Sequence, residues 1–229
     1  MMQQHKILMV LTSHDAMGDT GHKTGFWLEE FTTPYYAFKD AGATVVVASP
    51  KGGAAPIDPN SEAEDAQSES TRRFDGDAEL QDMINNTVKL SDVNAYEYDA
   101  IFYPGGHGPL WDLAEDPTSR QLIETFYYQG KPVGAVCHGP AVFRHTRSDR
   151  DEPLVQGKRV TGFTNGEEAA VGLTEVVPFL VEDMLKENGG LYEKADDFTS
   201  YVVTDGNLVT GQNPVSSEAC VNAVLALLK

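Results

Sequence analysis

Cysteine is scarce in this sequence of 229 residues, which contains only Cys137 and Cys220. Two cysteines allow at most one internal disulfide, so the framework of a disulfide-rich secreted domain is excluded. Cys220 falls in an apolar pattern typical of a helix, whereas Cys137 follows an apolar run typical of a strand. The sequence therefore predicts two free thiols in a reducing compartment, the cytoplasm.

Basic residues are also few, and long apolar runs are absent. The chain has 17 Lys and Arg against 35 Asp and Glu, which gives a formal net charge of −18. This charge repels nucleic acid and anionic membranes, and no run of about 18 apolar residues is available to cross a bilayer. We therefore expect a small-molecule substrate, with no nucleic-acid partner and no membrane partner.

The common spacings of metal ligands and phosphate-binding glycines are missing as well. His14, His22 and His107 raise the question of a metal, and His14 and His22 lie on one loop that could contribute a site, but the chain has no H-x-x-x-H, C-x-x-C or H-E-x-x-H pattern. It also has no G-x-G-x-x-G and no G-K-[ST] after a strand. We therefore expect no metal and no cofactor.

What the sequence does contain is an alternation of short apolar strands with amphipathic helices. This pattern predicts a single α/β domain over residues 1–229, with a mostly parallel sheet and helices on both faces. Residues 50–95 are expected to form either a small cap over the pocket or a surface excursion. The strands are expected at 7–12, 44–48, 100–103, 132–136 and 159–163, with a hairpin at 201–210, and the helices at 24–41, 118–129, 178–187 and 215–228.

The chain is organised around residues 131–140, K-P-V-G-A-V-C-H-G-P. An apolar strand ends on Cys137, and small residues follow before an expected helix at 141–143, which is the pattern of a nucleophile elbow. A helix start and the imidazole of His138 would both favour thiolate, so we expect Cys137 to be ionised near neutral pH. The alternative is a buried cysteine that acts only as a small hydrophobe.

A second turn follows another predicted strand, with the sequence P-G-G-H-G-P at 104–109. Glycines directly after a strand allow backbone N–H groups to point at an anion. We expect Gly105, Gly106 and His107 to form the oxyanion- and substrate-binding turn. Its donors would be the backbone N–H of Gly106 or His107, together with that of His138.

The stretch A-V-C-H-G-P resembles the elbow of the ThiJ/PfpI superfamily, whose members are relatives of the class I glutamine amidotransferases. Within it, the chain is similar to the branch of glutathione-independent glyoxalases, also described as glyoxalase III and as heat-shock chaperones. The resemblance extends to T-G-F-W-L-E-E-F-T-T-P and to G-K-R-V-T-G-F-T-N-G-E-E, and covers nearly the whole chain. It implies a flavodoxin-like fold and a homodimer.

The resemblance also implies roles for two acidic residues beside Cys137 and His138. The family has a glutamate four residues before a proline that points at the cysteine, and this spacing selects Glu30, with Glu29 as its rival. The family pairs the histidine with a downstream acid, for which Glu168 is our choice over Glu167. The expected catalytic set is therefore Cys137, His138, Glu30 and Glu168.

The function implied by the resemblance is conversion of methylglyoxal-type 2-oxoaldehydes to 2-hydroxy acids such as D-lactate, without glutathione. Cys137 would form a hemithioacetal and Glu30 would move a proton between the adjacent carbons. One alternative is an amidase, peptidase or deglycase that uses the same residues for acyl transfer. Another is a stress chaperone or redox sensor whose cysteine is oxidised.

Overall fold

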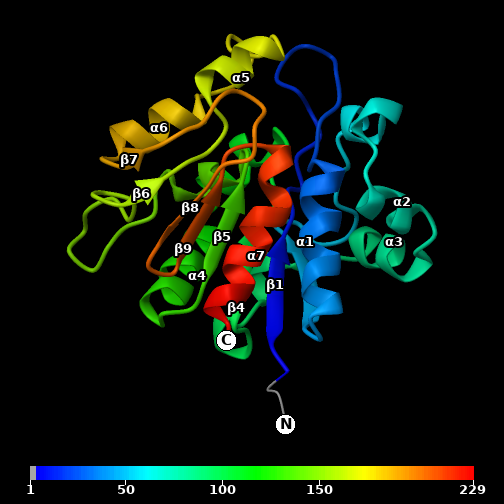
Figure 1. Ribbon diagram of the computed structural model, residues 1–229, viewed down its shortest axis with the longest axis horizontal. Coiled ribbons are helices and arrows are strands. Elements are labelled where there is room, and N and C mark those ends of the chain that lie inside the picture. Colours follow the sequence, from blue (N-terminus) through cyan, green and yellow to red (C-terminus); the bar gives the residue numbers. More distant parts are fainter. Residues whose placement is uncertain (1–3) are drawn as a thin grey trace.

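The computed structural model describes residues 4–229, and its centre is a seven-stranded sheet (Figure 1). The strand order is β3-β2-β1-β4-β5-β9-β8, and every pairing is parallel except that of β8 with β9. The strands of this sheet are β1 (Lys6–Val10), β2 (Thr44–Ser49), β3 (Val88–Lys89), β4 (Ala100–Tyr103), β5 (Val133–Val136), β8 (Val202–Asp205) and β9 (Leu208–Gly211). The predicted α/β fold is confirmed.

Successive side chains of each strand point to opposite sides of the sheet, and both sides are buried. In β1, Ile7 and Met9 belong to one core cluster, whereas Leu8 and Val10 belong to the other. Helices cover both clusters, which explains why the central strands carry apolar residues at nearly every position.

The helices divide between the two faces. Aromatic and aliphatic residues of α1 and α7 share one cluster, and those of α4 share the other, with α1 and α7 side by side in front of the sheet in Figure 1. No helix within residues 4–229 is both long and apolar enough to cross a membrane. The helices are α1 (Leu28–Asp40), α2 (Glu69–Asp75), α3 (Ala78–Asn85), α4 (Pro117–Tyr128), α5 (Asn165–Ala170), α6 (Val181–Glu187) and α7 (Ser217–Leu227).

The predicted strand at 159–163 is wrong in its length, and it lies outside the central sheet. Only β6 (Arg159–Val160) is extended, and it pairs with β7 (Leu191–Tyr192) in a separate two-stranded sheet. The backbone N–H of Thr161 then donates to the side chain of Thr210 at 2.9 Å, so a side chain takes the place of a ladder partner. The segment therefore leaves the strand geometry early and leads into α5.

Most of the 50–95 elaboration packs at the side of the molecule. Helices α2 and α3 lie beside α1 in Figure 1, and Tyr36 on α1 donates its hydroxyl to Asp77 at 2.9 Å. Residues 56–58 reach the segment before α1, where Phe26 N–H donates to the carbonyl of Pro56 at 2.9 Å. This stretch of the elaboration thus adjoins the loop that precedes Glu30.

Candidate active site

Cys137 follows β5 directly, at the carboxyl edge of the sheet where ligands bind in open α/β folds. Its φ of 63° lies in the left-handed region, which costs a non-glycine residue free energy. Two backbone hydrogen bonds hold it there: Cys137 N–H donates to Gly211, and Phe163 N–H donates to the Cys137 carbonyl, both at 2.9 Å. The local geometry is that of the predicted elbow.

The turn after Cys137 differs from the expected α-helix. Residues Gly139–Phe143 form a 3₁₀-helix, and a Cβ placed on Gly139 would lie 2.4 Å from the carbonyl oxygen of Tyr103. The chain therefore passes so close to β4 that only glycine fits at this position. A five-residue 3₁₀-helix supplies little of the dipole that a longer α-helix would contribute to stabilising a thiolate.

The surroundings of Cys137 favour the protonated thiol, which is the opposite of the direction that the sequence predicts for its pKa. The side chain is 3% exposed, and burial raises its pKa well above the usual value. The negative charges of Glu30, Glu167 and Glu168 raise the pKa further. A proton acceptor is therefore required before the sulfur can attack a substrate.

His138 is placed to accept that proton. Its Nδ1 lies 3.4 Å from Cys137 Sγ, and its Nε2 lies 2.6 Å from Glu168 Oε2. Burial lowers the pKa of His138, and the neighbouring His107 lowers it further, against the opposing effect of Glu168. A neutral imidazole with Nε2–H donated to the carboxylate leaves Nδ1 free to take a proton from sulfur.

The choice between Glu167 and Glu168 follows from how α5 begins. Thr164 caps this helix, and Glu167 completes a capping box: the Thr164 N–H donates to Glu167 Oε1, and the Glu167 N–H to Thr164 Oγ1, both at 2.9 Å. Glu167 is thereby committed to the backbone, whereas Glu168 reaches His138. Burial alone would raise the pKa of Glu168, but His138 and His107 outweigh it and lower the pKa well below its usual range.

Glu30 is fully buried near the first turn of α1, whereas its rival Glu29 is partly exposed. Glu30 Oε1 accepts a hydrogen bond from Gly105 N–H at 2.8 Å, and Oε2 has no partner among residues 4–229. Burial raises the pKa of Glu30 well above its usual value, and interaction with Cys137 acts in the opposite direction. The site thus holds a carboxyl group close to the thiol with one oxygen free.

The predicted oxyanion turn lies next to this carboxyl group and to the elbow. A Cβ on Gly105 would lie 2.5 Å from Glu30 Oε1 and 2.8 Å from the backbone nitrogen of His138. Gly106 has a φ of 89°, which favours glycine. Within residues 4–229, the backbone N–H groups of Gly106, His107 and His138 donate to no protein acceptor, so they are available to a developing oxyanion.

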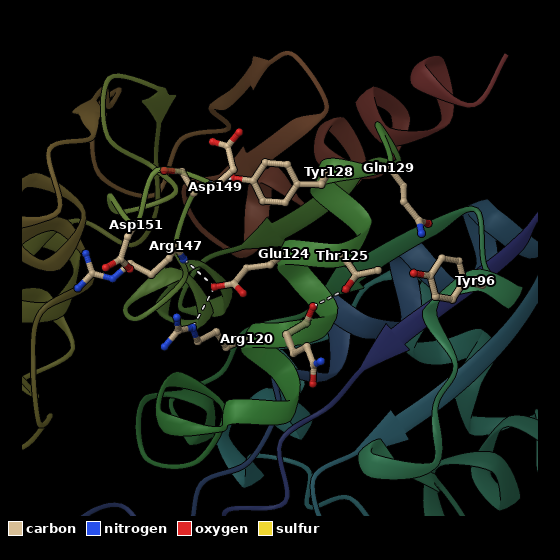
Figure 2. A pocket seen from close by; sticks show the side chains of 11 residues that line it. Tyr96, Arg120, Glu124, Thr125, Tyr128, Gln129, Arg147, Asp149 and Asp151 are labelled. Carbon is tan, nitrogen blue, oxygen red and sulfur yellow. Dashed lines mark hydrogen bonds and ion pairs between the residues drawn. The ribbon is translucent and has the colours of Figure 1, made fainter.

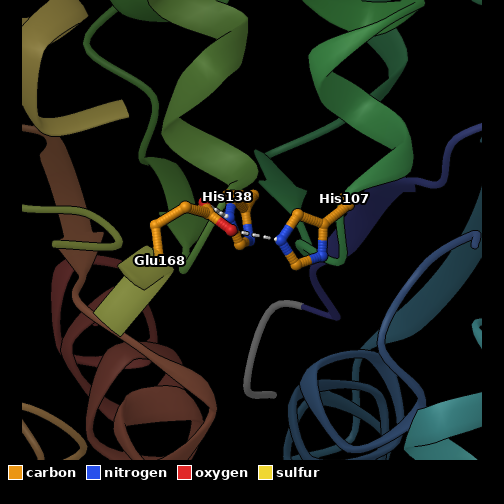
Figure 3. A group of neighbouring side chains, drawn as sticks. All are labelled: His107, His138 and Glu168. Carbon is orange, nitrogen blue, oxygen red and sulfur yellow. Dashed lines mark hydrogen bonds and ion pairs between the residues drawn. The ribbon is translucent and has the colours of Figure 1, made fainter. Parts of the chain in front are cut away.

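His107 was expected to contribute its backbone N–H, and the contact of its side chain with Glu168 was not predicted. His107 Nε2 lies 2.6 Å from Glu168 Oε1, so the carboxylate bridges two imidazoles (Figure 3). The two rings are 4.0 Å apart between centroids, and Phe163 packs on His138 at 4.3 Å. The position of His107 in the sequence could have indicated its contact with Glu168. It lies in a turn directly after one parallel strand, so it reaches the same edge of the sheet as Cys137, which follows the next strand. His14 instead stacks on Trp111.

A separate surface cleft of about 550 Å³ lies along α4 and the loop at 147–151 (Figure 2). One ion pair lies in it, in which Arg120 donates to Glu124 at 2.9 Å, and the backbone N–H of Arg147 donates to the same carboxylate at 2.7 Å. The cleft contains neither Cys137 nor Glu30. Its lining therefore provides no nucleophile for the chemistry at the elbow.

The strand order and the buried Cys-His-Glu arrangement at the carboxyl edge define an α/β protein of the nucleophile-elbow class. The DJ-1/PfpI family profile matches residues 22–227, and the chain belongs to this family. This confirms the resemblance inferred from the sequence.

Individual relatives match over nearly the full length. The chain is 31% identical to "Glyoxalase 3" of Candida albicans, over 96% of this chain and 97% of the relative. It is 32% identical to "Glutathione-independent glyoxalase HSP31" of Saccharomyces cerevisiae, over 100% of both. The crystal structure of Rapid Encystment Protein 24 KDa of Francisella tularensis superposes with a TM-score of 0.95 at 40% identity, over 99% of this chain and 100% of the other.

Proposed function

We propose that this protein is a glutathione-independent glyoxalase that converts methylglyoxal-type 2-oxoaldehydes to D-lactate-type 2-hydroxy acids. The observation that carries the proposal is the buried carboxyl of Glu30, whose Oε2 is unpartnered beside the Cys137–His138 pair. Acyl transfer needs only nucleophile, base and oxyanion donors, whereas moving a proton between two carbons needs a further acid–base group. The names of the two fungal relatives support the same activity.

The first step is addition of sulfur to the aldehyde. His138 Nδ1 takes the proton of Cys137 Sγ across 3.4 Å, and sulfur bonds to the aldehyde carbon to give a hemithioacetal. The charge that develops on the aldehyde oxygen is stabilised by the free N–H groups of Gly106, His107 and His138. Glu168 stabilises the imidazolium that forms, and the imidazolium then gives its proton to the aldehyde oxygen to complete the hemithioacetal.

The second step transfers a proton within the bound molecule. Glu30 removes the proton from the carbon that carries sulfur, which gives an enediolate, and returns a proton to the neighbouring carbon. The product is a thioester on Cys137. Water then cleaves the carbon–sulfur bond, which releases the 2-hydroxy acid and restores the thiol. Cysteine supplies the sulfur that glutathione would otherwise provide.

The burial of the site favours this reading over its alternatives. Cys137 is 3% exposed and Glu30 is 0% exposed, which suits a substrate of a few atoms better than a peptide chain. A redox sensor needs an accessible cysteine with a lowered pKa, whereas burial raises the pKa of Cys137. The chaperone alternative rests on the resemblance alone.

The test is D-lactate release from methylglyoxal by the purified protein in a buffer with EDTA and without glutathione, measured with D-lactate dehydrogenase. We expect turnover with no added metal. A fluorogenic amide substrate, assayed in parallel, should be cleaved more slowly than methylglyoxal is converted, because the buried site suits a substrate of a few atoms. Amide cleavage without D-lactate, or activity that needs zinc to recover after chelation, would contradict the proposal.

We also propose that the chain works as a homodimer in the cytoplasm. Both cysteines are free and buried, which suits a reducing compartment. Analytical ultracentrifugation in the presence of a reducing agent measures the mass of the assembly directly, and the mass of a single chain would contradict the dimer.

A further inference from the structure

The three residues in Figure 3 are ligand-type side chains that converge from three separate segments. One ligand atom each from His107, His138 and Glu168 lies within 4.8 Å of the others, and all three residues are buried. We propose that they form an inhibitory site for a first-row divalent cation, with Zn²⁺ as the representative ion. No second group of three such residues occurs within residues 4–229.

The donor set has the chemistry of a zinc site with an open position. Two imidazole nitrogens and a carboxylate are three protein ligands, and a fourth position remains for water or a small molecule. Imidazole also suits Cu, Fe and Ni, whereas Mg²⁺ and Ca²⁺ prefer sites built only from oxygen. The site should therefore distinguish zinc from magnesium.

The present geometry needs only a small adjustment to receive the ion. Each His Nε2 lies 2.6 Å from a Glu168 oxygen, whereas two tetrahedral ligands of zinc are separated by about 3.3 Å at bond lengths of about 2.0–2.1 Å. Each contact must therefore open by less than about 1 Å. Glu168 lies on α5, a helix of six residues, whereas the histidines follow β4 and β5 of the central sheet. A shift of α5 is enough to admit the ion.

Occupation of this site would stop the proposed reaction without touching sulfur. The ion takes Nε2 of His138, which is the atom that now donates to Glu168 and keeps the imidazole oriented. Cys137 Sγ lies 3.4 Å from Nδ1, which is on the opposite side of the same ring. The cysteine is therefore outside the ligand set, and inhibition follows from loss of the His138–Glu168 hydrogen bond.

The binding test uses the full chain and Zn²⁺ in competition with a chromophoric chelator. We expect one Zn²⁺ per chain, and no competition from millimolar Mg²⁺. Cys137→Ser should still bind one Zn²⁺, whereas His107→Ala should bind it more than about 10-fold more weakly. His145→Ala is the matched control, because His145 also pairs with a carboxylate, Glu115, at 2.8 Å but on the surface; its affinity should equal that of the unmodified chain.

Two outcomes would overturn the site itself. Loss of zinc binding in Cys137→Ser would make the sulfur a ligand, and unchanged binding in His107→Ala would place the ion elsewhere. Glu168→Gln repeats the second test from another element, and circular dichroism without metal verifies that each variant is folded. Normal zinc affinity in either the His107 or the Glu168 variant overturns the proposal.

The inhibition rests on the proposed function, whereas the binding does not. Methylglyoxal turnover should fall in proportion to zinc occupancy and recover when EDTA is added. Full turnover by the zinc-loaded protein would overturn the inhibitory role. Absence of D-lactate from the zinc-free protein would instead contradict the glyoxalase proposal, so the two failures are distinguishable.

Discussion

At the scale of single residues, the two cysteines provide the first test. Both are buried, but only Cys137 lies at the elbow; the Cys220 thiol lies on α7, 3.8 Å from the Ala135 carbonyl. Cys137→Ser should abolish oxoaldehyde turnover while the melting temperature changes little, because serine fits the same space. Cys220→Ser is the matched control and should retain turnover, since its hydroxyl can bond the same carbonyl. A Cys137→Ser enzyme with full activity would refute the role of the sulfur.

The two adjacent glutamates of α1 provide the second test. Glu30→Gln should lower turnover by about 10²-fold or more, because an amide cannot carry a proton between carbons. Glu29→Gln should leave turnover nearly unchanged, since Glu29 makes no hydrogen bond to the thiol within residues 4–229.

The rate of Cys137 alkylation by iodoacetamide, followed against pH, separates this role from a structural one. Because burial and the charge of Glu30 raise the thiol's pKa, alkylation should be slow at neutral pH and should increase only in alkaline solution, above the usual pKa of a thiol. Glu30→Gln removes the charge, so alkylation in alkaline solution should become faster while turnover falls. Fast alkylation of the unmodified chain at neutral pH, or an inactive Glu29→Gln, would contradict this account.

At the scale of elements, α5 assigns different tasks to neighbouring carboxylates. Glu167 accepts hydrogen bonds from the backbone N–H of Thr164 and Phe198 and from the side chain of Asn213, at 2.8–2.9 Å. Glu167→Gln should therefore lower the free energy of unfolding by about 1–3 kcal/mol, the scale of a hydrogen bond to a charged group. Glu168→Gln should mainly lower turnover. Urea unfolding and steady-state kinetics on both variants measure the separation, and the reverse pattern would exchange the two roles.

The same scale shows what the sequence could reveal. Strands β1, β2, β4 and β5 were predicted because their apolar runs are local and bounded by turns. The partner of β6 was not, because propensity does not identify which strand a segment will pair with. The elbow followed from small residues around Cys137. The direction of the shift in the pKa of Cys137 could not be predicted in the same way. That pKa depends on burial and on Glu30 and Glu168, which only the fold brings near the sulfur.

At the scale of the whole molecule, the excess of acidic groups should make stability depend on salt. The formal charge is −18, and self-repulsion at this level is screened over about 10 Å in 0.1 M salt. The melting temperature should therefore rise as NaCl is added, as measured by differential scanning calorimetry. KCl at the same ionic strength should act equally, because the screening is not ion-specific. A flat or falling response would show that the acidic groups do not repel one another enough to matter.

The capping box of α5 has a consequence for any redesign of this scaffold. Because the cap fixes Thr164 and Glu167 three positions apart, the next residue is the one delivered to His138. The number of residues between the cap and Glu168 therefore decides which side chain pairs with His138. A single insertion or deletion between Thr164 and Glu168 would put a different side chain against the imidazole, even if every residue type were kept. Transfer of this site to another protein therefore requires residues 164–168 to be moved together, with their spacing unchanged.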